Sequence, residues 1–291
     1  MSDATDTSDA ADDHVYLSLA EQHDSDGEAR WAFGTGFEDP LHGVDTEVPA
    51  GVDTAELAAL CLALADDALV GAQRLAQWCT RAPELEEEVA LANIGLDLLG
   101  QARLLYARCG QVDGTGRGED AYAYSRDAGD FRSTRLAELP DSDFASCVVR
   151  LLVLSTWRLA LFTRLASAPD PVLAAVAAKG VPELAYHRQY AADWAVRLGD
   201  GTEESNRRMR AALEAVAPFL AELLDGRPEI AAADTEAVRQ ETLEVLDRVL
   251  SAAGLGLPPA PPGPSGPHTD HLTPLLAELQ SVARAFPGAT W

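Results

Sequence analysis

A stripe of three polar residues marks the helix that the sequence predicts over residues 83–109. Asn93, Asp97 and Gln101 recur every four residues and therefore share one face, while most other positions are apolar. A helix that is apolar nearly all round is expected to be enclosed by other helices. A carboxylate in such surroundings must be paired, hydrogen-bonded or bound to a metal, because a bare charge there costs several kcal/mol. Asp97 is therefore the first candidate for chemistry.

Buried carboxylates on facing helices would suit a carboxylate-bridged di-iron centre. Such a centre takes one Glu from each of two helices and a Glu-x-x-His from each of the other two. None of the six histidines follows a Glu by three residues, so this signature is absent. The nearest remnant begins at Glu183, with Tyr186 at the ligand position and His187 one place later. On the helix that carries the stripe, the corresponding pair is Asp97 and Gly100, and glycine has no side chain to bind a metal.

Two interpretations of these polar groups remain open. In the first, Asp66, Asp97, Glu183 and His187 bind a degraded or single-metal site, and the chain is itself a metal-dependent oxygenase. In the second, the same groups neutralise one another with arginine and hydroxyl partners, as the remnant of a metal site. The predicted helix 143–168 supplies no acid at its middle, where Ser155, Thr156 and Arg158 stand. Too little negative charge is left for two divalent ions, so we favour the second interpretation and expect no metal in this chain.

A cluster of arginines lies in the connection between the predicted helices 83–109 and 143–168. The connection contains Arg126, Asp130, Phe131, Arg132, Ser133 and Arg135. In a chain this acidic, such a cluster is typical of a site for phosphate or for an acidic partner. The alternative is ordinary salt bridging to Asp127, Asp130 and Glu138.

The segment His268-Thr269-Asp270-His271 has side chains that could hold a metal. It also stands where a helix is expected to begin. Thr and Asp are preferred N-cap residues, because their side-chain oxygens accept from the first backbone N–H groups. We therefore interpret Thr269 or Asp270 as a cap.

The charge of the chain excludes two classes of partner. The formal net charge is −25, and Lys179 is the single lysine. A surface with this much negative charge repels nucleic acid and anionic lipid. We therefore expect neither nucleic acid nor a membrane as partner.

The cysteines and the N-terminus indicate a cytoplasmic location. Cys61, Cys79, Cys109 and Cys147 have no CxxC spacing and read as small buried apolar residues in a reducing compartment. The acidic N-terminus lacks the basic and apolar regions of a signal peptide. No run reaches the roughly 18 uninterrupted apolar residues that would span a bilayer.

Leu and Ala dominate the apolar residues, which favours helix over sheet. The sequence predicts an acidic disordered tail and an extended arm over residues 1–52, and a helical domain over 53–291. Within that domain Pro83 suits the first position of its helix. The expected helices are 53–79, 83–109, 143–168, 170–199, 202–225, 235–253 and 269–286. Four long helices with a long connection between the second and third predict an all-α, ferritin-like bundle with flanking helices.

Several segments resemble the PaaC family, the C subunits of phenylacetyl-CoA epoxidase (ring 1,2-epoxidase). They are APELEEEVALANIGLDLLGQAR, ALFTRLASAPDP, AYHRQY with the following WAVRLGDGT, and PHTDHLTPLLAELQ, together with the terminal Trp291. The resemblance covers about residues 55–291. The segment of the second helix, APELEEEVALANIGLDLLGQAR, and the C-terminal segment are specific to this family.

The resemblance implies a role in phenylacetate catabolism as a non-catalytic structural subunit of a multicomponent monooxygenase. Its partners would be the catalytic di-iron A subunit, a small B subunit, and a reductase with FAD and an iron–sulfur cluster that is fed by NADPH. The complex would insert one oxygen atom of O₂ into the ring of phenylacetyl-CoA. Phenylacetyl-CoA would bind at or near the subunit interface, and the phosphates of coenzyme A would make Arg126, Asp130, Phe131, Arg132 and Ser133 a candidate site.

Overall fold

The computed structural model describes residues 41–225, 227, 234–261, 263, 265–287 and 289, and every regular element in them is helical. The chain divides into two units between His42 and Gly43, and nearly all of the described residues belong to the second, Gly43–Trp291. The predicted acidic tail and most of the predicted arm lie outside the described residues. The proposed division at residue 52 stays a prediction.

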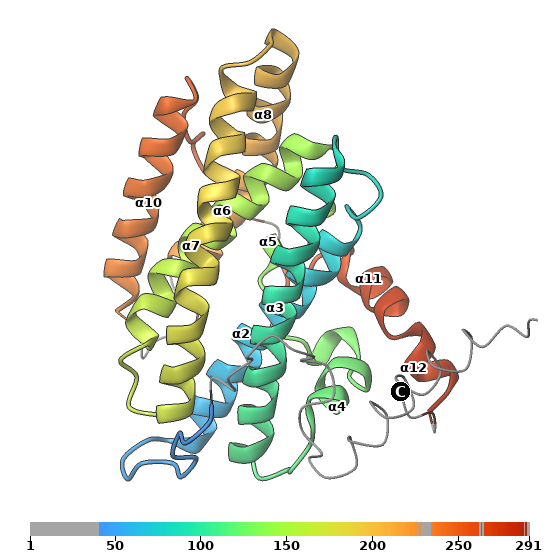
Figure 1. The fold of residues 1–291 in the computed structure, drawn as a ribbon, viewed down its shortest axis with the longest axis vertical. Helices are drawn as coiled ribbons and strands as arrows, with labels where there is room; N and C mark the ends of the chain where they lie inside the picture. Colours follow the sequence, from blue (N-terminus) through green and yellow to red (C-terminus); the bar gives the residue numbers. More distant parts are fainter. Residues whose placement is uncertain are drawn as a thin grey trace, which may run out of the picture. The chain divides into compact units, whose positions relative to one another are not determined.

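A four-helix bundle forms the centre of the second unit. Its members are α2 (Thr54–Ala76), α3 (Leu85–Val112), α6 (Phe144–Leu165) and α7 (Pro171–Gly199). α2 packs along α3, α6 packs along α7, and α3 meets α7 (Figure 1). Short turns join the helices within each pair, whereas residues 113–143 make the long connection between the pairs. This arrangement confirms the predicted ferritin-like bundle.

Short helices fill the long connection and flank the bundle. The connection contains α4 (Glu119–Tyr124), η1 (Ala128–Asp130) and α5 (Arg135–Glu138). After the bundle come α8 (Glu203–Val216), η2 (Ala217–Phe219), α9 (Leu220–Leu224), α10 (Thr235–Ala252), α11 (Leu272–Leu279) and α12 (Ser281–Ala285). α10 packs against α6 and α7, whereas α11 meets η1 in the long connection (Figure 1).

Side-chain caps explain where most of the long helices begin. The carboxylate of Asp53 accepts from the backbone N–H of Ala55 and of Glu56 at the start of α2. Asp170 caps α7 and is followed by proline at the first helical position. α3 begins at Leu85, and its N-cap residue Glu84 makes no side-chain cap bond. The prediction that Pro83 opens this helix is therefore wrong.

α6 is the most deeply buried element of the bundle. By length and composition it could cross a membrane, yet 83% of its most apolar window lies inside the protein. Trp157 and Phe162 are almost fully buried among its leucines. A helix that is apolar all round is expected at the centre of a core, and α6 takes that place.

α3 differs from this expectation on one face. Four of its large apolar side chains are exposed, with exposed fractions of 70% for Leu85, 53% for Val89, 63% for Leu96 and 38% for Leu99. The opposite face carries Leu91 and Ile94, which are fully buried. The prediction that other helices of this chain enclose α3 is therefore wrong for the face that carries Leu96.

Candidate functional site

The polar stripe of α3 meets α7 in a ladder of side-chain contacts. His187 Nε2 lies 3.0 Å from Asp97 Oδ2, and Gln101 Nε2 donates to Glu183 Oε2 over 2.9 Å. His187 and Gln101 are buried, whereas the side chain of Asp97 is 38% exposed. The two contacts are spaced by four residues on both antiparallel helices. The stripe therefore holds α3 against α7, and Asn93, which continues it, is exposed.

Arg158 of α6 brings a positive charge into the centre of the bundle. Its Nε donates to Gln101 Oε1 over 3.0 Å, and its Nη1 donates to the carbonyl of Leu64 over 3.1 Å. The guanidinium carbon lies 4.4 Å from the centre of the Phe162 ring, a cation–π contact. Burial lowers the pKa of Arg158 to about 10, although the nearby carboxylate of Asp67 acts to raise it. Arg158 therefore stays charged at neutral pH and attracts the carboxylates around it.

A small cavity of about 40 Å³ lies beside this guanidinium. Asp67, Arg158 and His187 line it, together with apolar side chains of α2, α3 and α6. Arg158 Nη2 and His187 Nδ1 are buried and make no hydrogen bond within the described part of the chain. The cavity is large enough to hold water, which can accept from a guanidinium and donate to an imidazole nitrogen.

Asp66 lies in a different network from the stripe. Its carboxylate pairs with the guanidinium of Arg126, and it also accepts from the hydroxyl of Tyr106 and from the backbone N–H of Arg132. All three donors come from α3 or from the connection after it. Asp67, the next residue on α2, lines the central cavity, and its carboxylate accepts from the backbone N–H of Thr134 and pairs with Arg227.

The predicted pseudo-site is therefore divided by the fold. Asp97, Glu183 and His187 meet along the α3–α7 ladder, whereas Asp66 pairs with Arg126 and Tyr186 is 50% exposed. Glu183 is further engaged by Lys179, one helical turn earlier. Among the described residues, no group of three His, Cys, Asp or Glu side chains could hold a metal ion. This donor set does not fit a metal pair.

The predicted coenzyme A residues are mostly buried. Arg126, Phe131 and Ser133 lie inside the protein, while Asp130 and Arg132 are exposed. Arg126 uses its guanidinium on Asp66, on the carbonyl of Tyr122 and on the carbonyl of Asp130. Of the predicted phosphate donors, the structure leaves the side chain of Arg132 at the surface. That these residues bind coenzyme A stays a prediction.

The alternative salt bridges of this cluster also differ from expectation. Arg126 pairs with Asp66 rather than with a neighbour in its own segment, and Arg135 pairs with Glu222 of α9. Each partner is distant in the sequence, so local spacing could not identify it.

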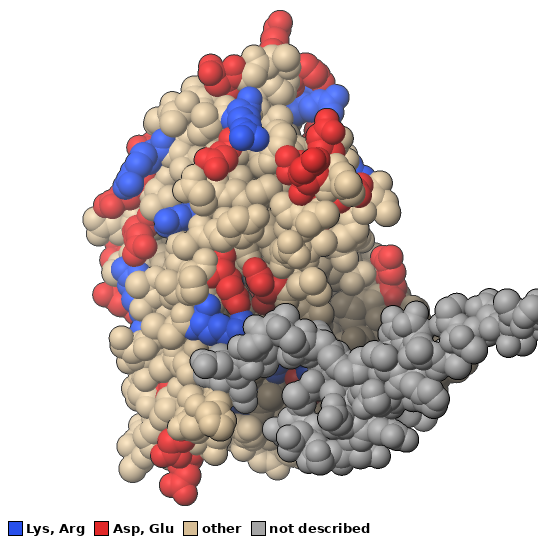
Figure 2. All heavy atoms as spheres, viewed as in Figure 1, with Lys and Arg blue, Asp and Glu red and all other residues tan. Residues whose placement is uncertain are grey.

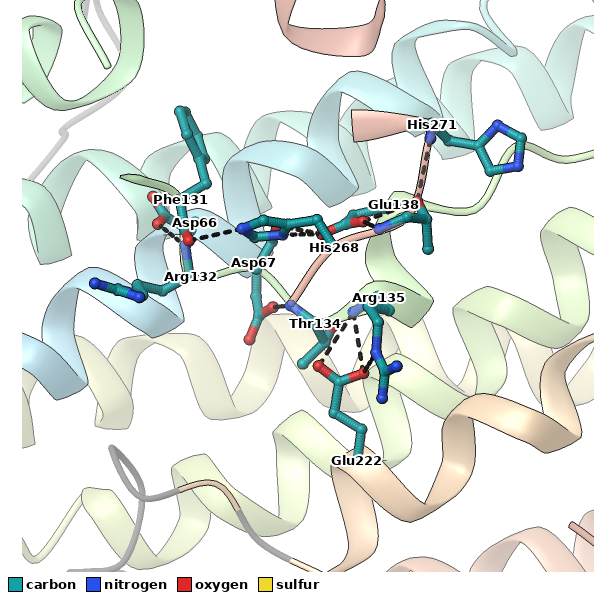
Figure 3. Close-up of polar contacts among 12 residues, drawn as sticks. Asp66, Asp67, Phe131, Arg132, Thr134, Arg135, Glu138, Glu222, His268 and His271 are labelled. Atoms are coloured by element: carbon teal, nitrogen blue, oxygen red, sulfur yellow. Dashed lines mark hydrogen bonds and ion pairs between the residues drawn. The ribbon is translucent and has the colours of Figure 1, made fainter. Parts of the chain in front are cut away.

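Sequence reasoning missed a network centred on Glu138 (Figure 3). This carboxylate is fully buried and accepts from the backbone N–H of Thr269 over 2.6 Å and from its hydroxyl over 2.8 Å. His268 Nδ1 lies 2.7 Å from Glu138 Oε1, and His268 Nε2 lies 3.0 Å from the carbonyl oxygen of Phe131. The network joins the connection after α3 to the segment that precedes α11.

The prediction that Thr269 or Asp270 caps the last helix is wrong. α11 begins at Leu272, and its N-cap position is His271, which makes no side-chain cap bond. Thr269 accepts from the N–H of His271 over 3.3 Å, but its own donors are directed at Glu138. Nothing in the local sequence pointed to Glu138, because it lies 131 residues away.

Comparison with known proteins places the whole helical unit in one family. The sequence profile of the family described as "Phenylacetic acid catabolic protein" matches residues 43–291. This chain belongs to that family. The phenylacetic acid catabolic family profile thus spans all four bundle helices and the segment that binds Glu138.

A curated relative extends the comparison. The chain is 40% identical over 247 residues to the C subunit of 1,2-phenylacetyl-CoA epoxidase of Escherichia coli (strain K12). The alignment covers 81% of this chain and 99% of that protein. The likeness is therefore not limited to one motif, because it extends over nearly the whole length of a named epoxidase subunit.

Proposed function

We propose that this chain is a non-catalytic structural subunit of the multicomponent oxygenase that epoxidises the aromatic ring of phenylacetyl-CoA in phenylacetate catabolism. Its task is to stabilise a di-iron catalytic subunit. The relative from Escherichia coli supports the substrate and the complex, because the match spans 99% of that protein. The word subunit in the name of that relative also supports partners of a different sequence.

One observation carries the non-catalytic part of the proposal. Arg158 places a buried guanidinium between α2, α3 and α6, where it donates to Gln101 and to the carbonyl of Leu64. A fixed cation at this point repels any divalent ion, while the nearby carboxylates of Asp67 and Glu183 are already paired with Arg227 and Lys179. The guanidinium of Arg158 thus supplies the positive charge that a metal ion would otherwise supply, and its hydrogen bonds join α6 to α2 and α3.

The remaining parts of the enzyme follow from this role. The di-iron subunit supplies the chemistry that inserts one oxygen atom of O₂ into the ring. A reductase with FAD and an iron–sulfur cluster passes electrons from NADPH, and a small B subunit completes the complex. This chain holds no cofactor of its own and works in the cytoplasm.

Coenzyme A binding is a second part of the proposal, and it rests on Arg132. This side chain is exposed, while its backbone is held by a hydrogen bond on each side of the Cα. Its N–H donates to Asp66 over 2.7 Å, and its carbonyl accepts from Arg227. A guanidinium on a fixed backbone is suited to a phosphate, because less freedom is lost when it binds.

The test is co-expression of this chain with a helical subunit that carries Glu-x-x-His motifs. Size-exclusion chromatography, iron quantification and an NADPH-dependent epoxidation assay with added reductase are the measurements. We expect a stable complex that is active, and an isolated chain with no stoichiometric iron and no oxygenase activity. An isolated chain with about two bound iron atoms would instead support the alternative, a metal-dependent oxygenase in its own right.

A further inference from the structure

The exposed apolar residues of α3 follow a regular spacing. Leu85, Val89, Ala92, Leu96 and Leu99 are separated by four, three, four and three residues. Ala92 is half-buried, and the other four are the exposed side chains described above. We call these five residues the α3 seam.

This spacing is that of a helix which packs against another helix. Apolar residues that alternate at intervals of three and four define a narrow seam with a mean period of 3.5 residues. A second helix with the same repeat can lie along it at a shallow crossing angle of about 20°. α3 already packs along α2, and Leu91 and Ile94 on its inner face are fully buried, so the seam is additional to the core.

The side chains that flank the seam indicate the charge of the missing helix. Glu86 and Glu88 stand beside Leu85 and Val89, at the positions which form interhelical ion pairs in such contacts. Acidic side chains are spread over the face that Figure 2 shows, in keeping with the net charge of −25. A second copy of this chain that packed parallel along the seam would bring like charges together at its N-terminal end. A helix with arginine or lysine beside its own apolar repeat would not.

The C-terminal end of the seam also permits a close approach. Gly100 follows Leu99, and a Cβ added to it would meet no atom within 4 Å. Glycine at a helix surface lets a second backbone come near, because no side chain holds it away. Because the acidic residues flank one end of the seam and the glycine lies at the other, the two ends differ, and a partner helix is expected to bind in one orientation only.

We infer that the α3 seam is the docking surface for an amphipathic, basic-flanked helix of the di-iron subunit. This inference rests on the proposed function, because it takes the partner from there and adds the surface and the kind of element that binds. The partner helix would bury the seam along its length, including the exposed side chains of Leu96 and Leu99.

The test compares Leu96→Glu and Leu99→Glu with Val282→Glu. Val282 of α12 is 53% exposed and lies outside the seam. Val282→Glu is therefore a control for the effect of placing a negative charge at an exposed apolar position. All three variants should fold, because the replaced side chains are at the surface; circular dichroism and the melting temperature check this. We expect each seam variant to weaken binding to the di-iron subunit 100-fold or more, and Val282→Glu less than threefold, by titration calorimetry.

A second measurement locates the contact directly. Hydrogen exchange followed by mass spectrometry should show new protection within residues 85–103 when the complex forms. The hydrogen exchange of α12 should be the same in the complex as in the isolated chain.

The outcomes separate the two proposals. If the wild-type chain binds the di-iron subunit while both seam variants bind as tightly as Val282→Glu, the seam is overturned and the proposed function stands. If the wild-type chain does not bind the di-iron subunit, both are overturned. If the isolated chain dimerises and Leu96→Glu makes it monomeric without weakening binding to the di-iron subunit, then the seam is occupied by a second copy of the chain, which overturns the inference.

Discussion

Arg126 and Asp66 form a buried two-point ion pair that joins α2 to the connection between α3 and α6. Arg126 Nη1 donates to Asp66 Oδ2 over 3.1 Å, and Nη2 bonds to the second carboxylate oxygen. The guanidinium also lies 4.1 Å from the centre of the Phe131 ring. A carboxylate with no access to solvent is thus matched by a fixed cation, and the long connection is held to the bundle at this point.

Replacement of Arg126 by methionine should lower the free energy of unfolding by about 3–5 kcal/mol, because it leaves the charge of Asp66 buried without its partner. Urea unfolding followed by circular dichroism measures this loss. Arg103→Met is the control, since the Arg103–Glu119 pair is partly exposed and should contribute at most about 1 kcal/mol. Equal losses in the two variants would contradict the structural role of the buried pair.

Arg158→Met should lower the free energy of unfolding by about 2–3 kcal/mol, because it leaves the buried Gln101 Oε1 without its donor and removes the second hydrogen bond to the carbonyl of Leu64. Iron quantification of the same variant tests whether the positive charge of Arg158, and not the packing of the helices, excludes metal from the bundle. Arg210→Met on the exposed face of α8 should change stability by less than about 0.5 kcal/mol. A loss no larger than that of Arg210→Met would show that the buried guanidinium does not hold the bundle together.

Gly180→Ala should destabilise the protein, because the new Cβ would lie 2.7 Å from the ring of Phe162. Overpacking of this kind costs about 1–3 kcal/mol. The matched variant Gly100→Ala should stabilise the isolated chain by about 0.5–1 kcal/mol, since alanine is the better helix former and no atom is near. Thermal unfolding of the two variants should therefore shift in opposite directions, and a shared direction would be inconsistent with this packing.

The stability of the protein should decrease as the pH rises above about 6.5, because of His268. Its hydrogen bond to Glu138 raises its pKa above the ordinary value of about 6.5, although partial burial acts in the opposite direction. Both ring nitrogens face acceptors, Glu138 Oε1 and the carbonyl of Phe131, so the charged form satisfies both contacts. The stabilisation is complete below the ordinary pKa and is lost as the pH rises through the raised folded-state pKa.

Urea midpoints measured from pH 5.5 to pH 9 check this dependence. His268→Gln keeps a polar side chain but does not titrate, so its midpoint should fall less steeply over the same pH range. Parallel curves for the wild type and the variant would rule out His268 as the cause.

Arg132→Glu should weaken binding of phenylacetyl-CoA to the complex about tenfold or more while assembly stays intact, because it places a negative charge where phosphate would bind. Binding is measured by calorimetry with the complex. Arg210→Glu, at another exposed arginine, on α8, is the control for the change in net charge. Unchanged affinity in Arg132→Glu would remove this residue from the proposed coenzyme A site.

The helices and their order follow from features that are local in the sequence. Leu and Ala at helical spacing, with Asp53 and Asp170 as caps, mark the ends and faces of α2 and α7. The absence of Glu-x-x-His is also local, since residues three apart on a helix must share a face to bind one metal pair. These features were sufficient to predict a ferritin-like bundle without a di-iron motif.

The tertiary structure alone decided which groups meet. Asp66 and Asp67 are adjacent on α2, yet one pairs with Arg126 and the other lines the central cavity beside Arg158. Helical periodicity places side chains on faces, but it does not say which element covers a face or whether any does. For the same reason the sequence predicted an enclosed α3, whereas packing left Leu96 at the surface. Which long-range contacts form depends on the free energy of the whole packed chain. That free energy cannot be inferred from a short window of neighbouring residues.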